Sequence, residues 1–258
     1  MNNILSQVGY RVFYVWMRNA VSYRRFVFPT LIASIGEPLL YLVAIGFGLG
    51  SYLGLINGMP YLNFMAPGLI VSAIMFSATF ECTYSSFVRM TIEKVYNAQL
   101  VTPVSVEEVI AGEILWGMTR GAISGIIMLA MLAAFGLAKG AWLAAYPLLW
   151  IFTGFFFASL SMVITSFARN FDFFTYYFQL FISPMFFFSG IFFPLDHFPP
   201  AVQMVAHFLP LTYAVNISRA LIEGTVSARI LLDLSALIIP GIIFFALALY
   251  RMKKRIVK

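Results

Sequence analysis

Charged residues are scarce in this sequence. Only 10% of its 258 residues are Asp, Glu, Lys or Arg, whereas 62% are hydrophobic and the mean hydropathy is +0.92. Soluble globular proteins carry about 25% charged residues and roughly 45–50% apolar residues. This shortage of charge excludes a water-soluble monomer and indicates an integral membrane protein.

Cysteine, histidine and familiar nucleotide-binding or catalytic motifs are scarce or missing as well. Cys82 is the only cysteine, so the chain has no internal disulfide and no Cys-based metal site. His197 and His207 have a spacing that fits no short metal-binding motif, so we expect no metal site. The sequence has neither a G-x-x-x-x-G-K-S/T phosphate loop nor a G-x-S-x-G elbow. Energy for any transport must therefore come from a partner or from an ion gradient.

Six apolar runs are long enough to cross a membrane as helices. A helix of about 20 residues spans a hydrocarbon layer of roughly 30 Å, and the alternating pattern of barrel strands does not occur in these runs. We therefore predict an all-α, multi-pass membrane protein with one domain, residues 1–258. The predicted spans are residues 28–53, 61–87, 109–135, 142–167, 173–193 and 230–250.

The basic residues fall mainly on one side of these spans. Of the 16 Lys and Arg residues, 12 lie in segments that would face the same side. They are Arg11, Arg18, Arg24, Arg25, Arg89, Lys94, Arg169, Arg251, Lys253, Lys254, Arg255 and Lys258. By the positive-inside rule, both termini are predicted to be cytoplasmic. The net charge of +6 then has a membrane explanation, and we expect no nucleic-acid partner.

The first 26 residues are predicted to form an amphipathic helix in the membrane interface. Val8, Val12 and Val15 recur at helical spacing, while Arg11 and Arg18 can reach anionic lipid headgroups. Because arginines interrupt every apolar stretch here, a cleavable signal peptide is not expected. A solvated cytoplasmic tail is the alternative.

The cytoplasmic segment between the second and third spans is predicted to contain a short helix at residues 92–100. Pro103 ends it, and Ser105 followed by Glu108 has the capping-box pattern that starts the next helix. An ordinary solvated loop is the alternative.

The extracytoplasmic segment 194–229 is unusually apolar and is divided by prolines. Residues 200–208 and 211–223 have helical periodicity but are too short to span a membrane, which fits a re-entrant pair of half-helices. We interpret this hairpin as a gate, with a fixed plug as the alternative; Arg219 and Glu223 can pair on one helix face. The predicted gate residues are Leu211, Tyr213, Asn216, Arg219 and Glu223.

Charged residues inside the spans are costly, at about 2.5–3.5 kcal/mol each at a helix centre. Glu81 and Arg120 lie about 12 and 18 Å inward from the same side. We predict that they form an interhelical ion pair that fixes helix register, with a proton relay as the alternative.

These features together resemble the ABC-2 family, the permease subunits of ATP-binding-cassette exporters. The resemblance covers the whole chain and rests most on LVTPVS at residues 100–105 and LPLTYAV at residues 209–215. Four further stretches resemble the branch that exports lipooligosaccharides such as nodulation factors. They are YLNFMAPG at 61–68, FECTY at 80–84, SPMFFFSG at 183–190 and FPLD at 193–196.

The resemblance implies a half-transporter in the bacterial inner (cytoplasmic) membrane. Two copies of the chain would surround a central path, each docked on a separate ATPase subunit that binds ATP and Mg, while this chain binds no cofactor and is not itself an enzyme. It also implies that the helix at 92–100 couples the two subunits. The implied ATPase-coupling residues are Ile92, Glu93, Lys94, Tyr96, Asn97, Leu100, Thr102 and Pro103.

Aromatic residues crowd the start of the fifth span. They are interpreted either as lipid-facing packing or as a wall for a substrate with sugar and acyl parts. The resemblance places the path between spans one and five, which favours the second interpretation. The candidate path residues are Tyr41, Tyr176, Tyr177, Gln179 and Phe181.

Three classes of function remain open from the sequence. The first is an ATP-driven exporter of a lipid-linked or amphipathic glycan, or, within the same family, of a drug or lipid. The second is a proton-coupled secondary transporter, for which two broken regions are expected where only one is visible. The third is a membrane enzyme for lipid-linked sugars, against which the scatter of the ten acidic residues argues.

Overall fold

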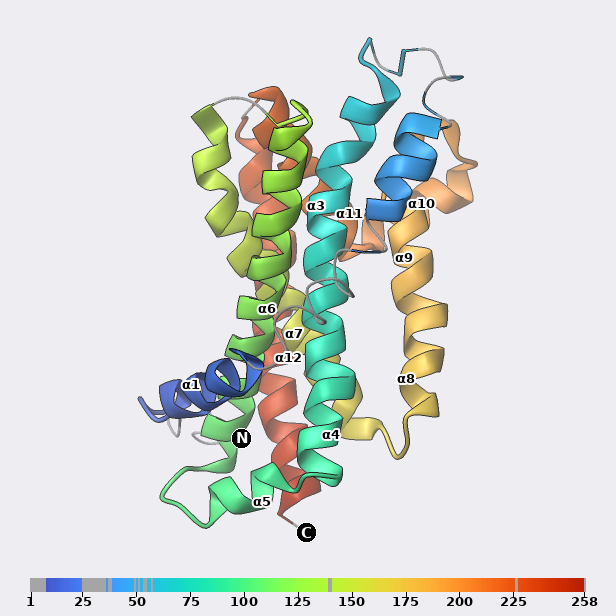
Figure 1. Cartoon of the computed structure of the whole chain (residues 1–258). Coiled ribbons are helices and arrows are strands. Elements are labelled where there is room, and N and C mark those ends of the chain that lie inside the picture. Colours follow the sequence, from blue (N-terminus) through green and yellow to red (C-terminus); the bar gives the residue numbers. More distant parts are fainter. Residues whose placement is uncertain are drawn as a thin grey trace.

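The computed structural model describes residues 8–24, 36, 39–48, 50, 52, 55–56, 58–138, 141–225 and 227–257. These residues fold into helices and connecting turns; within them, extended pairing is limited to one isolated bridge between Ile56 and Met59. The all-α prediction is confirmed for this part of the chain. Long helices stand side by side in a bundle, and a shorter helix lies across one side (Figure 1).

Four helices among the described residues are long and apolar enough to cross a membrane, and they match predicted spans two, three, four and six. They are Tyr61–Thr91, Val106–Ala134, Trp142–Phe167 and Arg229–Ile256. The first consists of α3 (Tyr61–Phe80), the π-helical turn η5 (Glu81–Ser85) and α4 (Ser86–Thr91). The others are α6 (Val106–Ala134), η6 with α7 (Ala141–Ala145 and Tyr146–Phe167), and α12 (Arg229–Ile256).

The count of six spans stays a prediction. Residues 28–35 and 37–38 of the first predicted span lie outside the described residues. The part that follows is the short apolar helix Leu39–Gly48, which ends in π-helix η3 (Leu42–Gly48). The segment predicted as the fifth span consists of α8 (Asp172–Tyr177), η7 (Phe178–Ile182) and α9 (Ser183–Phe188). It ends five residues before the predicted boundary at 193, because Gly190 adopts a left-handed φ of 77° that terminates helices.

The start of α6 confirms the capping-box prediction and corrects a boundary. Ser105 Oγ accepts a hydrogen bond from Glu108 N at 3.2 Å, and Ser105 N donates to Glu108 Oε2 at 2.8 Å. The helix therefore begins at Val106 rather than at residue 109. The helices of predicted spans two and six also extend further than predicted, to Thr91 and Ile256. Their final turns contain basic residues but no helix-breaking residue.

Helix α1 (Val12–Tyr23) packs across α6. Val12, Val15 and Asn19 are buried in that contact, and Gly112 of α6 leaves room for Val15. The opposite face of α1 exposes Phe13, Tyr14 and Met17. Residues 1–7 and 25–26 of the predicted interfacial helix lie outside the described residues.

The segment between α9 and α12 forms the predicted pair of short helices. After the turn η8 (Leu195–His197) come α10 (Pro200–Phe208) and α11 (Pro210–Glu223), which confirms helical residues 200–208 and 211–223. Helix α11 packs among α3, α7 and α12, whereas α10 is mostly exposed. Ser218 of α11 donates to Pro67 O at 2.7 Å, which ties α11 to α3.

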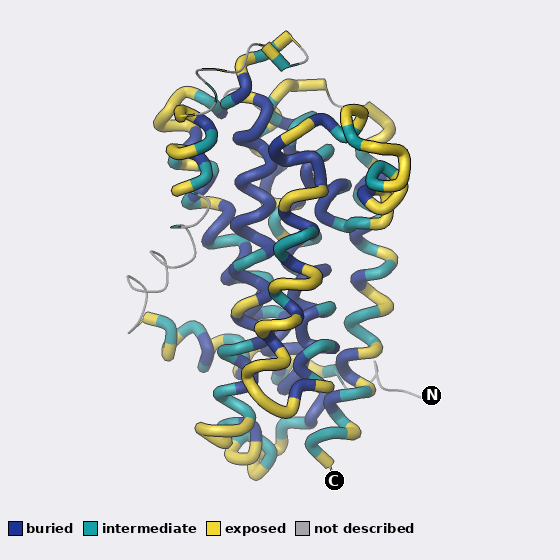
Figure 2. The backbone as a smooth tube through the Cα atoms, turned by 90° about the vertical axis from the view of Figure 1, so that its right-hand side faces the viewer, coloured by how far each residue is buried: buried dark blue, intermediate teal, exposed yellow. Residues whose placement is uncertain are grey.

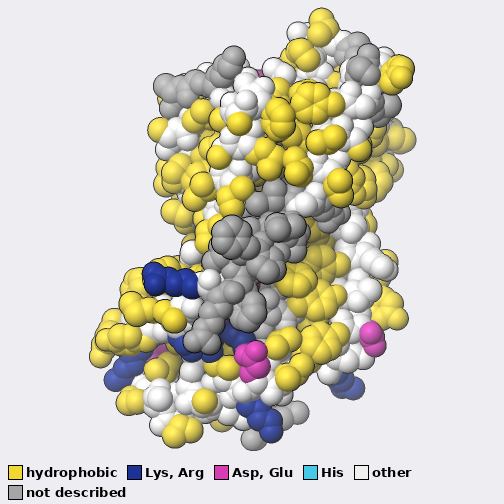
Figure 3. All heavy atoms as spheres, in the orientation of Figure 1, with side chains coloured by type: hydrophobic (Ala, Val, Ile, Leu, Met, Phe, Trp, Pro, Cys, Tyr) yellow, Lys and Arg dark blue, Asp and Glu magenta, His cyan; other side chains and the backbone are white. Residues whose placement is uncertain are grey.

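The bundle has two distinct ends. We call the end with α5 (Val95–Leu100) and the last turn of α12 the basic end, and the end with α10 the hairpin end (Figure 1). Burial is greatest through the middle of the bundle, and exposed residues gather at both ends and on outer turns (Figure 2). On the face shown in Figure 3, the visible Lys and Arg side chains lie toward the basic end, and the coloured side chains toward the hairpin end are mostly hydrophobic.

Candidate functional site

The first part of the candidate site is α5, the short helix at the basic end. The sequence predicted a helix at residues 92–100, but α4 ends at Thr91 and α5 starts at Val95. Lys94 between them has φ 53° and ψ 29°, a left-handed conformation that interrupts a helix. The predicted coupling residues Ile92, Glu93 and Lys94 therefore form an exposed turn rather than the first turn of a helix.

The Tyr96 side chain anchors α5 to the bundle. Tyr96 is fully buried, and its hydroxyl lies 2.6 Å from Ser86 Oγ on α4, within hydrogen-bonding distance. Burial raises the pKa of the Tyr96 phenol, so it remains neutral and able to donate a hydrogen bond. Asn97 on the next position is exposed. Helix α5 is thus held from inside and presents polar residues outward.

The segment that follows α5 also contacts α1. Leu100 is half-buried, Thr102 Oγ1 donates to Gln99 O at 2.6 Å, and Arg11 donates to the carbonyl of Pro103. Apart from the buried Tyr96, the predicted coupling residues consequently lie at the surface of the basic end, near α1.

The second part of the site is a network of buried charges next to α5. Arg89 lies between two carboxylates: its Nη1 is 2.7 Å from Glu81 Oε1, and its Nη2 is 2.6 Å from Glu113 Oε2. Arg120 Nε lies 3.4 Å from Glu81 Oε2, and Arg18 Nη2 lies 3.3 Å from Glu113 Oε1. The sequence analysis placed Glu81 with Arg120, and the structure brings these two together.

The network joins α1, η5, α4 and α6. Glu113 and Glu81 have relative exposures of 0% and 5%, and Arg120 of 2%. Asn19 of α1 adds a hydrogen bond to Glu113 Oε1 at 2.9 Å. Removing one partner of a buried ion pair is strongly destabilising, so the network fixes these four elements relative to one another.

Sequence reasoning missed Arg89 as the centre of this network. The sequence pattern ends the second span at Phe87 and therefore predicts Arg89 in the loop that follows. The helix continues to Thr91 instead, so Glu81 and Arg89 lie about two turns apart on it and Arg89 turns back toward the bundle. The eight-residue spacing of these opposite charges was the signal available in the sequence.

The predicted path residues divide between two faces of the fifth span. Tyr177 is buried, whereas Tyr176, Gln179 and Phe181 are exposed. The ring of Tyr41, in the first predicted span, lies 5.0 Å from that of Phe186 and 5.6 Å from that of Phe192. Tyr41 therefore packs into an aromatic cluster with the end of α9, apart from the exposed set on the outer face.

The predicted gate residues lie on α11, and one expected pair is absent. Arg219 does not form an ion pair with Glu223; it donates to Gly190 O at 3.0 Å and Phe64 O at 3.2 Å. Its guanidinium also lies 4.1 Å from the centre of the Phe64 ring. Helical spacing alone predicted the pair with Glu223, but the carbonyls of α3 and of the turn after α9 compete for the same group.

The other gate residues have different surroundings. Leu211 is buried, and Tyr213 donates to His207 O at 2.6 Å, which ties α11 to α10. Asn216, Arg219 and Glu223 line a cavity of about 260 Å³ at the hairpin end. The gate itself remains a prediction.

The fold and site together define a class: a polytopic helical membrane protein with interhelical ion pairs, an exposed crosswise helix at its basic end, and no phosphate loop in its sequence. Residues 10–222 match the family model described as ABC-2 type transporter. The chain belongs to the ABC-2 type transporter family. Proteins of this family are membrane transport components that work with an ATP-binding-cassette ATPase subunit, and are not catalytic enzymes themselves.

Several relatives match almost the whole chain. It is 34% identical over 247 residues to nodulation protein J of Rhizobium leguminosarum bv. trifolii, covering 95% of this chain and 93% of that protein. It is 32% identical over 245 residues to nodulation protein J of Sinorhizobium fredii, covering 94% and 92%. The inner membrane transport permease YadH of Escherichia coli is 26% identical over 203 residues, with 78% of each chain covered.

Proposed function

We propose that this chain is the permease subunit of an ATP-driven exporter that moves a lipid-linked or amphipathic glycan outward across the bacterial inner membrane. Family membership makes it a transport component, and the near full-length similarity to nodulation protein J supports a lipooligosaccharide-like substrate. ATP and Mg bind to the partner ATPase rather than to this chain.

The arrangement of α5 is the observation that carries this proposal. It is short, exposed along one side, and anchored through Tyr96 to the helix that contains Arg89. A force applied to α5 by an ATPase would pass through Tyr96 and Ser86 to α4, and through the buried charges to α1 and α6. Packed elements of this kind move as rigid bodies in switching proteins.

The distribution of charge supports a cytoplasmic location for the basic end. Helix α5, the last turn of α12 and the basic residues of α1 belong to this end, and positive charge accumulates on the cytoplasmic side of membrane proteins. Both termini are then cytoplasmic, and α5 faces the compartment in which an ATPase would bind.

A homodimer with the path between its two copies fits the exposed apolar surfaces. Only 17% of the most apolar window of α12 is buried within one chain, and the outer face of the fifth span exposes Tyr176, Leu180 and Phe181. Membrane lipid or a second copy would cover these residues. One chain of this size leaves little room for a bulky glycolipid, and twofold symmetry would provide a wider path.

Exchanging the charges on the exposed turn before α5 tests the docking of the ATPase. The double substitution E93R/K94E is expected to abolish co-purification of the ATPase encoded by the neighbouring gene, with unchanged amounts of folded permease in the membrane. Both side chains are exposed, so the fold tolerates the exchange.

The matched control is D196R/R229E, which exchanges two exposed charges at the hairpin end and should leave co-purification unchanged. Full recovery of the ATPase with E93R/K94E would refute docking on this surface.

A further inference from the structure

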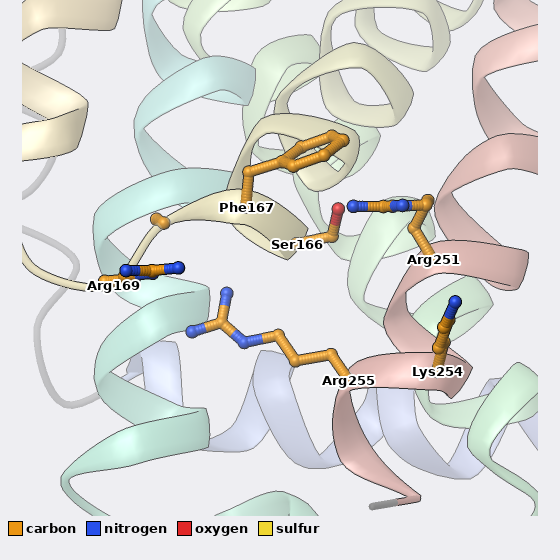
Figure 4. Close-up of a pocket in the computed structure, with 7 residues that line it drawn as sticks. Ser166, Phe167, Arg169, Arg251, Lys254 and Arg255 are labelled. Atoms are coloured by element: carbon orange, nitrogen blue, oxygen red, sulfur yellow. The ribbon is translucent and has the colours of Figure 1, made fainter.

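A second feature of the basic end lies outside the proposed docking surface. It is a cavity of about 420 Å³ between the end of α7, the turn that follows it, and the last two turns of α12. This volume falls within the roughly 300–1,000 Å³ range of small-molecule sites. Its main lining residues are Ser166, Phe167, Arg169, Arg251, Lys254 and Arg255 (Figure 4).

Four of these side chains are cationic, and none of the described residues that line the cavity is acidic. Arg251, Lys254 and Arg255 follow helical spacing and share one face of α12, opposite Arg169 on the other wall. In Figure 4 the Arg255 side chain reaches from α12 toward the turn that carries Arg169. Like charges gathered in this way repel one another, so an anion between them is electrostatically favoured.

Among the described residues, these cations differ from the other basic residues near them because no acidic side chain pairs with them. In the described part of the chain, Arg18, Arg89, Arg120 and Lys253 each form an ion pair with a glutamate. The adjacent Lys253 turns away from the cavity to pair with Glu107 of α6. The four cavity cations form no ion pair with any described carboxylate.

Local contacts hold two of the guanidinium groups in place. Arg251 lies 4.1 Å from the centre of the Phe167 ring, and Arg255 donates to the carbonyl of Thr165 and lies 5.6 Å from the Phe87 ring centre. Arginine held on aromatic rings keeps its remaining N–H groups available, and its planar fork matches the oxygens of a phosphate.

We propose that this cavity binds the phosphate group of an anionic membrane phospholipid. The shared chemistry is a phosphate anion, and two observations and one general rule favour the lipid as its source. The cavity opens where two membrane-length helices end, the exposed Phe167 ring offers an apolar contact beside the cations, and basic pockets between spans on the cytoplasmic side hold lipid headgroups. A bound headgroup bridges the end of α7 and the end of α12, and Arg255 connects it to Phe87 on the helix that anchors α5.

The test uses the full-length protein, purified in detergent with its native lipid removed. Its thermal unfolding is followed by tryptophan fluorescence while phosphatidylglycerol is added. Phosphatidylcholine with the same acyl chains, inorganic phosphate and a polyglutamate peptide are added in parallel. The variant R169Q/K254Q removes two exposed cations from opposite walls, and R24Q/R229Q removes two exposed cations elsewhere as the matched control.

Phosphatidylglycerol should stabilise the natural protein and R24Q/R229Q alike, and R169Q/K254Q should need at least about tenfold more lipid for the same effect. The single variant R251Q should also need more phosphatidylglycerol than the natural protein for the same stabilisation. Equal lipid dependence in R169Q/K254Q and the control would overturn the site. Equal stabilisation by phosphatidylcholine, inorganic phosphate or polyglutamate would overturn the assignment to an anionic lipid headgroup.

Discussion

At the scale of single residues, the chain concentrates its buried charge on a few side chains that satisfy one another. Arg89 forms ion pairs with two glutamates at once, and Glu113 accepts hydrogen bonds from Arg89, Arg18 and Asn19. A carboxylate with this many donors is held in one position. The composition already indicated that each intramembrane charge needs a partner, but which arginine meets which glutamate depends on where the helices end.

Removing the charge of Glu113 is expected to destabilise the protein strongly. The substitution E113Q leaves Arg89 and Arg18 without their shared carboxylate in a buried region, and the predicted loss is about 3–5 kcal/mol of unfolding free energy. Thermal unfolding in detergent measures it. The control E93Q changes a glutamate on the exposed turn before α5 and should unfold like the natural protein. Equal midpoints for E113Q and E93Q would show that the network contributes no stability.

At the scale of elements, sequence patterns located most of the helices but not all their ends. The capping box at Ser105 and the prolines around α10 and α11 are local signals, so the predictions there match the structure. The left-handed Lys94 is not marked by a glycine, and its effect on the start of α5 was therefore missed. Contacts between residues far apart in the sequence were harder to predict. Arg219, for example, donates hydrogen bonds to the carbonyls of Phe64 and Gly190 rather than pairing with Glu223.

Helix α1 offers a test of how closely two elements approach. A Cβ atom at Gly112 would lie 2.6 Å from Val15 Cβ and 3.0 Å from Val12 O. The substitution G112A should therefore displace α1 from α6 and lower the unfolding free energy by about 1–3 kcal/mol, the usual cost of overpacking.

Thermal unfolding again provides the measurement, with G36A as the control, because a Cβ at Gly36 would meet nothing within 4 Å. If G112A is as stable as G36A, α1 does not pack on α6 as described.

The proposed gate can be tested at the same scale. Cysteine at Tyr213 in each copy of a Cys82→Ser background should form an oxidant-dependent crosslink that stops export until it is reduced, because a locked α11 could not open. Transport into vesicles measures the effect, and the C82S protein with Tyr213 intact is the control. Undiminished export with the crosslink fully formed would leave the hairpin as a fixed plug.

In the whole molecule, the two surfaces for which we propose a function lie at opposite ends of one bundle. Helix α5 and the buried charges occupy the basic end, and α11 with its polar cavity occupies the hairpin end. Helices α3 and α4 belong to one long helix, Tyr61–Thr91, which extends from one end of the bundle to the other. Composition and charge distribution predicted this layout in outline, whereas the substrate and the number of copies depend on partners that the chain alone does not contain.

We propose that this permease couples the export of a glycolipid to ATP hydrolysis by a partner subunit. The most direct measurement is ATP hydrolysis by the permease and its co-purified ATPase in lipid vesicles, with and without an acylated oligosaccharide. We expect that the glycolipid stimulates hydrolysis, and that the same ATPase without the permease does not respond. Hydrolysis that is indifferent to the glycolipid but stimulated by an apolar drug would contradict the proposed substrate class, and failure of the two subunits to associate would contradict the coupling itself.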